Sequence, residues 1–238
     1  MSEAPRQIAL GDAFAVTSDA RWMNKVLTVG ACTLIPLAGI FQLLGYEERN
    51  YRHAQEGGEG LPDPILGEDI VAGFMMWLKS LANMLPMLLV TLGCFFGCTF
   101  VPTLVVAGGA SAAGMDQDNP LPALVMMVSM LFSYAGLFVG SLLIGVLSID
   151  FTRRLFNGES LPVLSPGVSI RAIRRNVGPF LLTWLGSMGA GFVGSLGVVL
   201  CYVGLFATLP LSMVIRGRLL AQWDAVVKAN EPVEEFGR

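Results

Sequence analysis

The chain has 238 residues, of which 54% are hydrophobic and only 14% are charged, and its mean hydropathy is +0.65. Soluble domains carry about 25% charged residues, and one core of this size cannot hide so much apolar surface from water. These values exclude a disordered chain, a secreted disulfide scaffold and an ordinary cytosolic enzyme. They predict an all-α fold, a polytopic integral membrane helix bundle.

Long stretches without charge predict where the chain crosses the membrane. Residues 26–46 form the first apolar stretch. Residues 84–112 and 121–149 each suit one long or tilted helix, because about 20 apolar residues cross a bilayer. Residues 176–215 are long enough for two spans, with the turn near 194–197. We therefore expect about four full spans, plus an N-terminal segment that either crosses the membrane or re-enters it.

The charged residues predict the boundaries and the orientation of this domain. We expect an N-terminal segment 1–25, a single transmembrane domain 26–223 and a C-terminal tail 224–238. No secretory signal is visible in the first 25 residues. Lys and Arg gather in every connecting segment except 113–120, and they favour the cytoplasmic side. The pattern therefore predicts a multi-pass protein with cytoplasmic N- and C-termini, and with 113–120 exported.

Residues 26–46 leave two topologies open. If the N-terminus and 47–69 both face the cytoplasm, then 26–46 is a re-entrant hairpin broken at Pro36, and other helices must shield its backbone. Lys79 then lies at the cytoplasmic interface. If 26–46 crosses once, 70–112 must cross twice, and Lys79 lies near mid-membrane at a cost of roughly 2.5–3.5 kcal/mol.

The sequence matches itself at an offset of 100 residues. The pattern G-E-x-L-P occurs at 58–62 and again at 158–162. One interpretation is an internal parallel repeat, in which Gly58 and Gly158 end helices. The other is a common helix-stop turn, with Gly as the cap and Pro as the breaker. The repeat places Glu59 and Glu159 at matched positions near Arg52 and Arg153, and we expect each Glu to form a structural ion pair with a nearby Arg.

The segment after the second turn predicts an interfacial helix. Ser165 and Pro166 suit the first positions of a helix. Beyond them, Arg171, Arg174 and Arg175 lie on one face and apolar side chains lie on the other. Such a basic face suits a lipid bilayer with anionic headgroups. The alternative is a docking face for a soluble partner.

Several short sequence motifs are distributed along the chain. They are residues 19–25 (DARWMNK), Gly30, 34–36, Gly39, 45–46, Arg49, 61–62, Gly73, and 200–204 with Pro210. Together they resemble the prokaryotic polytopic membrane family catalogued as domain of unknown function 4013, over residues 19–223. Members have no assigned activity. The resemblance therefore implies the class of protein and an inner-membrane location, and it supplies no mechanism.

Small residues recur at helical spacing and predict close helix contacts. Gly93 and Gly97 form one such pair, and Gly136 and Gly140 form another. Residues 186, 190 and 194 form one smooth ridge, and residues 187, 191 and 195 form the next. In lipid, such surfaces let helices approach closely, either within one bundle or at the seam of a homo-oligomer.

Chemistry-bearing residues are few. We expect no catalytic residue, metal or cofactor, because the single His and four Cys form no ligand set and no phosphate-binding or nucleic-acid motif is present. The remaining candidates for a binding role are charged, and they are Lys79, Glu59, Glu159, Arg153 and Arg154.

Three functions stay open at this point. The first is a non-catalytic membrane scaffold or assembly partner, which binds a second membrane protein or another copy of itself. The second is a transporter or channel for a small or lipidic solute, with helices broken at prolines near the midplane. The third is a membrane enzyme, which would have to use the Arg and Glu residues of the loops.

Overall fold

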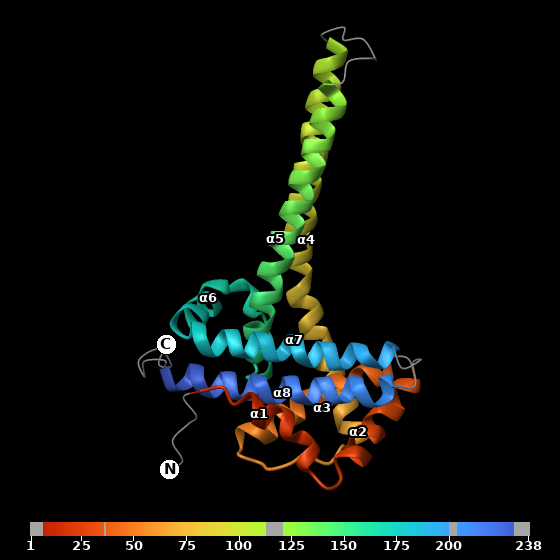
Figure 1. Ribbon diagram of the computed structural model, residues 1–238, viewed down its shortest axis with the longest axis vertical. Coiled ribbons are helices and arrows are strands. Elements are labelled where there is room, and N and C mark those ends of the chain that lie inside the picture. Colours follow the sequence, from red (N-terminus) through yellow and green to blue (C-terminus); the bar gives the residue numbers. More distant parts are fainter. Residues whose placement is uncertain (1–6, 36, 113–120, 200–203, 231–238) are drawn as a thin grey trace. The chain divides into compact units, whose positions relative to one another are not determined.

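The computed structural model describes residues 7–35, 37–112, 121–199 and 204–230 (Figure 1). Every regular element in these ranges is a helix, which confirms the all-α prediction. The longer helices are α1 (Leu10–Phe14), α2 (Trp22–Ala31), α3 (Ala38–Gln55), α4 (Leu66–Ala112), α5 (Leu121–Phe156), α6 (Pro166–Arg175), α7 (Val177–Val199) and α8 (Leu205–Asn230). Short 3-10 turns are η1 (Ala15–Ser18), η2 (Cys32–Leu34) and η3 (Pro162–Leu164). The chain forms two compact units, which we describe separately.

The unit Ala82–Ser148 contains the later part of α4 and the earlier part of α5. The described helical residues of this unit include no Lys, Arg, Asp or Glu. Large apolar side chains are exposed along both helices, such as Leu104 at 68% and Phe132 at 68%. Water is a poor solvent for such a surface, whereas lipid is a good one.

Three described helices are long and apolar enough to cross a membrane. They include Leu66–Gly97, Met126–Phe156 and Val177–Gly197. Together with the uncharged unit, these helices suggest a membrane location. The sequence predicted about four full spans. α8 is absent from the described candidates, and its sequence carries Arg216, Arg218, Asp224 and Lys228.

Helix α8 forms the core of the other unit, Met1–Leu81 with Ile149–Arg238. It contacts α1, α2, α3 and α7, and it lies side by side with α7 (Figure 1). Its side chains are buried on several faces, and Val214, Leu219 and Trp223 are fully enclosed. α8 continues to Asn230, so the first part of the expected tail 224–238 is helical.

The turn between the last two helices lies later than expected. We placed it near 194–197, but α7 continues to Val199. The glycines of this stretch serve helix packing instead. A Cβ at Gly197 would lie 2.7 Å from the backbone nitrogen of Leu205, and one at Gly194 would lie 3.0 Å from the hydroxyl of Ser212. Small residues here let α7 and α8 approach closely.

Of the two small-residue ridges on α7, the first faces the core. A Cβ at Gly186 would meet the Leu219 side chain at 2.8 Å, whereas one at Gly191 meets no described atom within 4 Å. Gly191 is exposed and leaves open space, although the hydroxyl of Ser187 on the same ridge is buried. Described atoms also leave open space at the glycine pairs of the other unit, at 93, 97, 136 and 140.

The first apolar segment is interrupted where Pro36 predicts a break. α2 ends at Ala31, η2 follows, and α3 begins at Ala38 after Leu37, which has φ = 68°. Pro36 itself lies outside the described residues. η2 and α3 fold closely together, because a Cβ at Gly39 would lie 2.7 Å from the carbonyl oxygen of Cys32. Residues 26–46 are therefore two helical pieces rather than one straight helix.

Helices α3 and α4 cross at a pair of glycines. A Cβ at Gly73 would overlap the carbonyl oxygen of Phe41 and lie 2.7 Å from the nitrogen of Gly45. A Cβ at Gly45 would overlap the carbonyl oxygen of Asp69. Only glycine permits backbones to approach this closely. The crossing fixes the end of α3 against the start of α4, where the candidate site lies.

Candidate functional site

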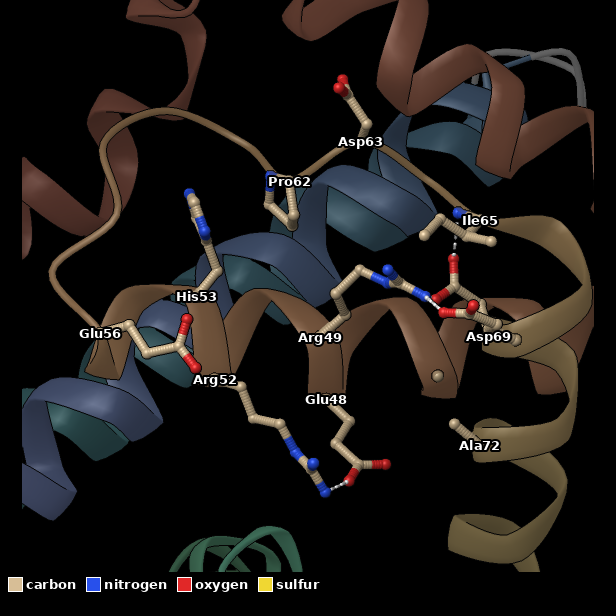
Figure 2. Close-up of a pocket in the computed structure, with 12 residues that line it drawn as sticks. Glu48, Arg49, Arg52, His53, Glu56, Pro62, Asp63, Ile65, Asp69 and Ala72 are labelled. Carbon is tan, nitrogen blue, oxygen red and sulfur yellow. Dashed lines mark hydrogen bonds and ion pairs between the residues drawn. The ribbon is translucent and has the colours of Figure 1, made fainter.

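A polar hollow of about 610 Å³ lies between the last turns of α3 and the first turns of α4 (Figure 2). One side is formed by α3, the other by α4, and the connecting loop closes it (Figure 2). Its lining residues are Gly45, Glu48, Arg49, Arg52, His53, Glu56, Pro62, Asp63, Ile65, Glu68, Asp69 and Ala72. It therefore combines five carboxylates, two guanidiniums and one imidazole.

The α3 side of the hollow is one face of a helix. Arg49, Arg52, His53 and Glu56 recur at spacings of three and four residues, so they line up along α3. The helix changes character towards this end, because its earlier part is apolar and its last two turns are charged. The charged side chains therefore lie at the end of α3, where they line the hollow.

Asp69 anchors the α4 side of the hollow. Its side chain is buried, and its Oδ1 accepts a hydrogen bond from Nε of Arg49 at 2.6 Å. Its Oδ2 accepts from Nε2 of Gln42 at 2.9 Å and from the backbone N–H of Ile65 at 3.0 Å. Arg49 also reaches Glu68, at 3.1 Å. These bonds join the start of α4 to α3 and hold Arg49 in place.

The other α3 side chains that line the hollow form fewer bonds than Arg49. Arg52 forms an ion pair with Glu48 one turn earlier, drawn as a dashed line in Figure 2. His53 Nε2 lies 3.3 Å from the carbonyl oxygen of Glu59. The carboxylate of Glu56 makes no hydrogen bond or ion pair with the described residues and is exposed. Arg52 and Glu56 are thus open to a ligand.

Asp19 fixes the loop beside the hollow. Its carboxylate accepts hydrogen bonds from the backbone N–H groups of Leu61 at 3.0 Å and Arg21 at 2.8 Å, and from Nζ of Lys25 at 3.1 Å. These donors favour the charged form and hold the pKa of Asp19 well below its usual range. Lys25 also pairs with Asp63 at 3.2 Å. The N-terminal region therefore holds the loop in position.

A second polar cluster is buried against α8. Arg153 donates from Nε to Asp150 at 2.7 Å and from Nη1 to Asp224 at 2.9 Å. Trp223 Nε1 donates to Asp150 at 3.0 Å, and Lys228 lies 2.6 Å from Asp224. All of these side chains except Lys228 are buried. The cluster links α5 to α8 and neutralises itself.

Glu47 is a buried acid of α3 that also faces α8. Its carboxylate lies 3.1 Å from Nε of Arg216, as an ion pair without hydrogen-bond alignment. Burial raises the pKa of Glu47, and Arg216 opposes this only in part. Next to it, Asn50 donates to the carbonyl oxygen of Val214 at 2.8 Å. These contacts bind α3 to α8.

The predicted pairing of each turn glutamate with a nearby Arg is confirmed for Glu159 and is not found for Glu59 among the described residues. Arg52 pairs with Glu48 rather than with Glu59, because Glu48 lies one turn away on the same helix. Glu159 pairs with Arg154 through two bonds, Nε to Oε2 at 2.7 Å and Nη2 to Oε1 at 2.5 Å. The Arg153 side chain points instead into the buried cluster.

Arg154 also holds the second turn together. Its Nη1 donates to the carbonyl oxygens of Pro162 at 3.2 Å and Ser165 at 3.1 Å, and to the hydroxyl of Ser169 at 2.9 Å. The start of α6 is thereby fixed to the end of α5. The role of Arg154 is therefore structural.

The helix-ending glycine of the first turn is Gly57 rather than Gly58. Gly57 has φ = 77° and Gly158 has φ = 92°, the left-handed conformation that ends a helix. The bond pattern is the same in both turns, since Gly58 N–H donates to the His53 carbonyl and Glu159 N–H to that of Arg154. The two turns therefore match at an offset of 101 residues.

None of the five residues proposed from the sequence lines the hollow. Lys79 lies further along α4 and is half-buried, and Glu59 is exposed in the loop. Arg153, Arg154 and Glu159 belong to the clusters at the end of α5. The sequence signal for the hollow is the spacing of three and four residues between the charged residues of 48–56, which places them on one face of a helix.

The long apolar helices and a unit built on internally paired charges are compatible with an all-helical membrane protein. Among the residues that the structure describes, no three His, Cys, Asp or Glu side chains lie close enough together to hold a metal ion. The model of the family described as protein of unknown function (DUF4013) matches residues 28–203, so the chain belongs to that family. Comparison with curated proteins and with solved structures gives no match.

Proposed function

We propose that this protein is a non-catalytic membrane scaffold or assembly partner. The observation that supports this function is that the buried Arg side chains are paired with carboxylates of the same chain. Arg153 is paired with Asp150 and Asp224, and Arg154 is paired with Glu159. Buried ion pairs between helices fix how those helices meet, and they leave few charged groups for chemistry. The charged unit then serves as a rigid platform joined to an apolar unit.

The apolar unit offers the surface for assembly. Its described helices expose Leu104, Met127 and Phe138 among other large side chains, together with small residues that meet no described atom. In lipid, such faces associate with other helices through close packing. The partner is then a second membrane protein or another copy of this chain.

The proposal includes an orientation. Both termini are cytoplasmic and 113–120 is exported, because Lys and Arg gather in 1–25, 47–69, 150–175 and 216–238 and are absent from 113–120. The membrane is the inner membrane of a prokaryote, as the family resemblance implies.

We also propose the internal repeat, with about four spans and a re-entrant first segment. The two turns match at an offset of 101, but two buried pairs on either side of them support the predicted offset of 100. Asn50 and Asp150 both bond to α8, and Asp69 and Ser169 both accept from an Arg.

A transporter or channel is the second candidate. The broken segment between α2 and α3 supports it, because interrupted helices often form binding sites in transporters. Flux measurements separate the two functions. Liposomes that contain the purified full chain should release trapped ions and small dyes no faster than empty liposomes.

A crosslinking experiment tests the scaffold directly. A photo-crosslinking residue at the exposed positions Met127 or Phe138 should give one discrete adduct in native membranes. The same residue at Leu219, which is fully buried, is the matched control and should give none. Diffuse crosslinking to lipid alone from both exposed positions, together with measurable flux, would replace the scaffold by the transporter.

A further inference from the structure

We propose that the hollow between α3 and α4 binds the headgroup of an aminophospholipid, which is a phosphodiester that carries a primary amine. This inference does not rest on the scaffold function, because it concerns a lipid site rather than a protein partner. It follows from three features of the hollow, namely an open guanidinium, an open carboxylate and an adjoining apolar surface.

The guanidinium of Arg52 is the group that would bind the phosphate. Its side chain is 61% exposed, and its Nη2 donates to Glu48. A guanidinium has five N–H donors in a planar fork, so the remaining donors are open to an anion. Arginine binds phosphate in this two-pronged manner more tightly than a single point charge does. Arg49 also lines the hollow, but its charge is already paired with Asp69 and Glu68, so Arg52 is the guanidinium left for the phosphate.

The carboxylate of Glu56 is the group that would bind the amine. Glu56 directly follows the last residue of α3, and its backbone lies one helical turn, about 5.4 Å along the axis, beyond that of Arg52. An ethanolamine group separates its amine from the phosphate by only two carbons, so the Arg52 guanidinium must turn from Glu48 towards Glu56 for one headgroup to reach both groups (Figure 2). Five carboxylates against two guanidiniums line the hollow, so a ligand that is only anionic is repelled. The charge balance therefore selects a ligand that carries an amine as well as a phosphate.

The surface next to the hollow identifies the source as a lipid rather than a soluble phosphate ester. Around and beyond Ala72, which lines the hollow, α4 exposes Val71 at 64%, Phe74 at 43% and Trp77 at 37%. Phe41 of α3 contacts both rings, with centroids 5.3 Å and 5.7 Å away. Trp beside an apolar face is typical of the membrane interface. An acyl chain can lie along this surface while the headgroup occupies the hollow.

The test compares three lipids on the full chain. The protein is purified in detergent and stripped of lipid, and phosphatidylethanolamine, phosphatidylcholine and phosphatidylglycerol with the same short acyl chains are titrated against it. Native mass spectrometry reports the fraction bound. Phosphatidylethanolamine should bind about tenfold more tightly than the other two, since choline has no N–H to donate and glycerol has no charge.

Substitutions then assign each half of the headgroup. Glu56→Gln should remove the roughly tenfold preference for phosphatidylethanolamine while leaving phosphatidylcholine binding unchanged. Glu59→Gln is the matched control, because Glu59 is exposed three residues away and does not line the hollow. Arg52→Gln should weaken all three lipids alike, because they share the phosphate.

Three results would overturn the proposal. Equal affinity of the unsubstituted protein for the three lipids would overturn it, and this result does not depend on whether any variant folds. A preference that survives in Glu56→Gln would show that the amine binds elsewhere. Competition by soluble glycerophosphoethanolamine as strong as that of the lipid would show that the apolar surface adds nothing, and the ligand would then be a soluble ester.

Discussion

Replacing Gly73 by Ala should force α3 and α4 apart. The new Cβ would overlap the carbonyl oxygen of Phe41 and lie 2.7 Å from the nitrogen of Gly45, and neither backbone atom can rotate away. Overpacking costs about 1–3 kcal/mol, and the upper end applies when backbone must move. Ala returns about 1 kcal/mol through its better helix propensity. The net loss is about 2 kcal/mol, or ~4–8 °C in Tm for a chain of this size.

The measurement is thermal unfolding of the detergent-purified protein, followed by circular dichroism. Gly67→Ala on the same helix is the matched control, because a Cβ at Gly67 meets no described atom within 4 Å. Its Tm should stay the same or rise slightly. If Gly73→Ala melts at the same temperature as Gly67→Ala, the close crossing of the two helices is wrong.

Four further predictions follow from the charged and glycine positions. Asp224→Asn should lower the free energy of unfolding by about 3–5 kcal/mol, because Arg153 and Lys228 lose their charged acceptor. Glu159→Gln should lower it by no more than about 1 kcal/mol. Equal losses for the two variants in a melting assay would contradict this. Gly158→Ala should cost about 1 kcal/mol, and Gly158→Asn should cost less, since Asn tolerates φ > 0; membrane abundance of the two variants is the readout. Burial raises the pKa of Glu47, so the folded state holds its proton longer and stability falls as the pH rises from 4.5 through the raised pKa; Glu47→Gln should abolish that fall in a pH series of melts. Backbone hydrogen bonds lower the pKa of Asp19, so its contribution is present above pH 3.8 and is lost in more acidic solution; an Asp19→Asn variant that loses stability in acid as steeply as the parent would refute this.

The charge pattern predicted the uncharged helical stretches well, because charge is the property that lipid discriminates most strongly, but it did not predict that the chain forms two compact units. The stretches 84–112 and 121–149 lie almost wholly in the uncharged unit, and the break near Pro36 falls where α2 and α3 separate. Local signals at these places agree with the tertiary structure. The family resemblance, which depends on short apolar motifs, is also confirmed.

Other features depended on contacts that sequence spacing does not reveal. Gly194 and Gly197 suggested a turn, but they are contact points between two helices. Trp223 is the last residue of the predicted transmembrane domain, but it is fully buried and its indole N–H donates to buried Asp150. Arg153 could pair with any nearby acid, and its partner Asp224 lies 71 residues away. Such partners are chosen by the packing of α5 against α8, which no local pattern encodes.

The buried cluster around Arg153 has a consequence for how the protein is made. Arg153 is synthesised 71 residues before Asp224, and at about 5–20 residues per second several seconds pass before that partner exists. During this time Asp150 is the cluster's only acid. A nascent chain that stops short of α8 therefore holds Arg153 with Asp150 as its only acidic partner in this cluster, and the buried cluster is complete only after the last helix has been made.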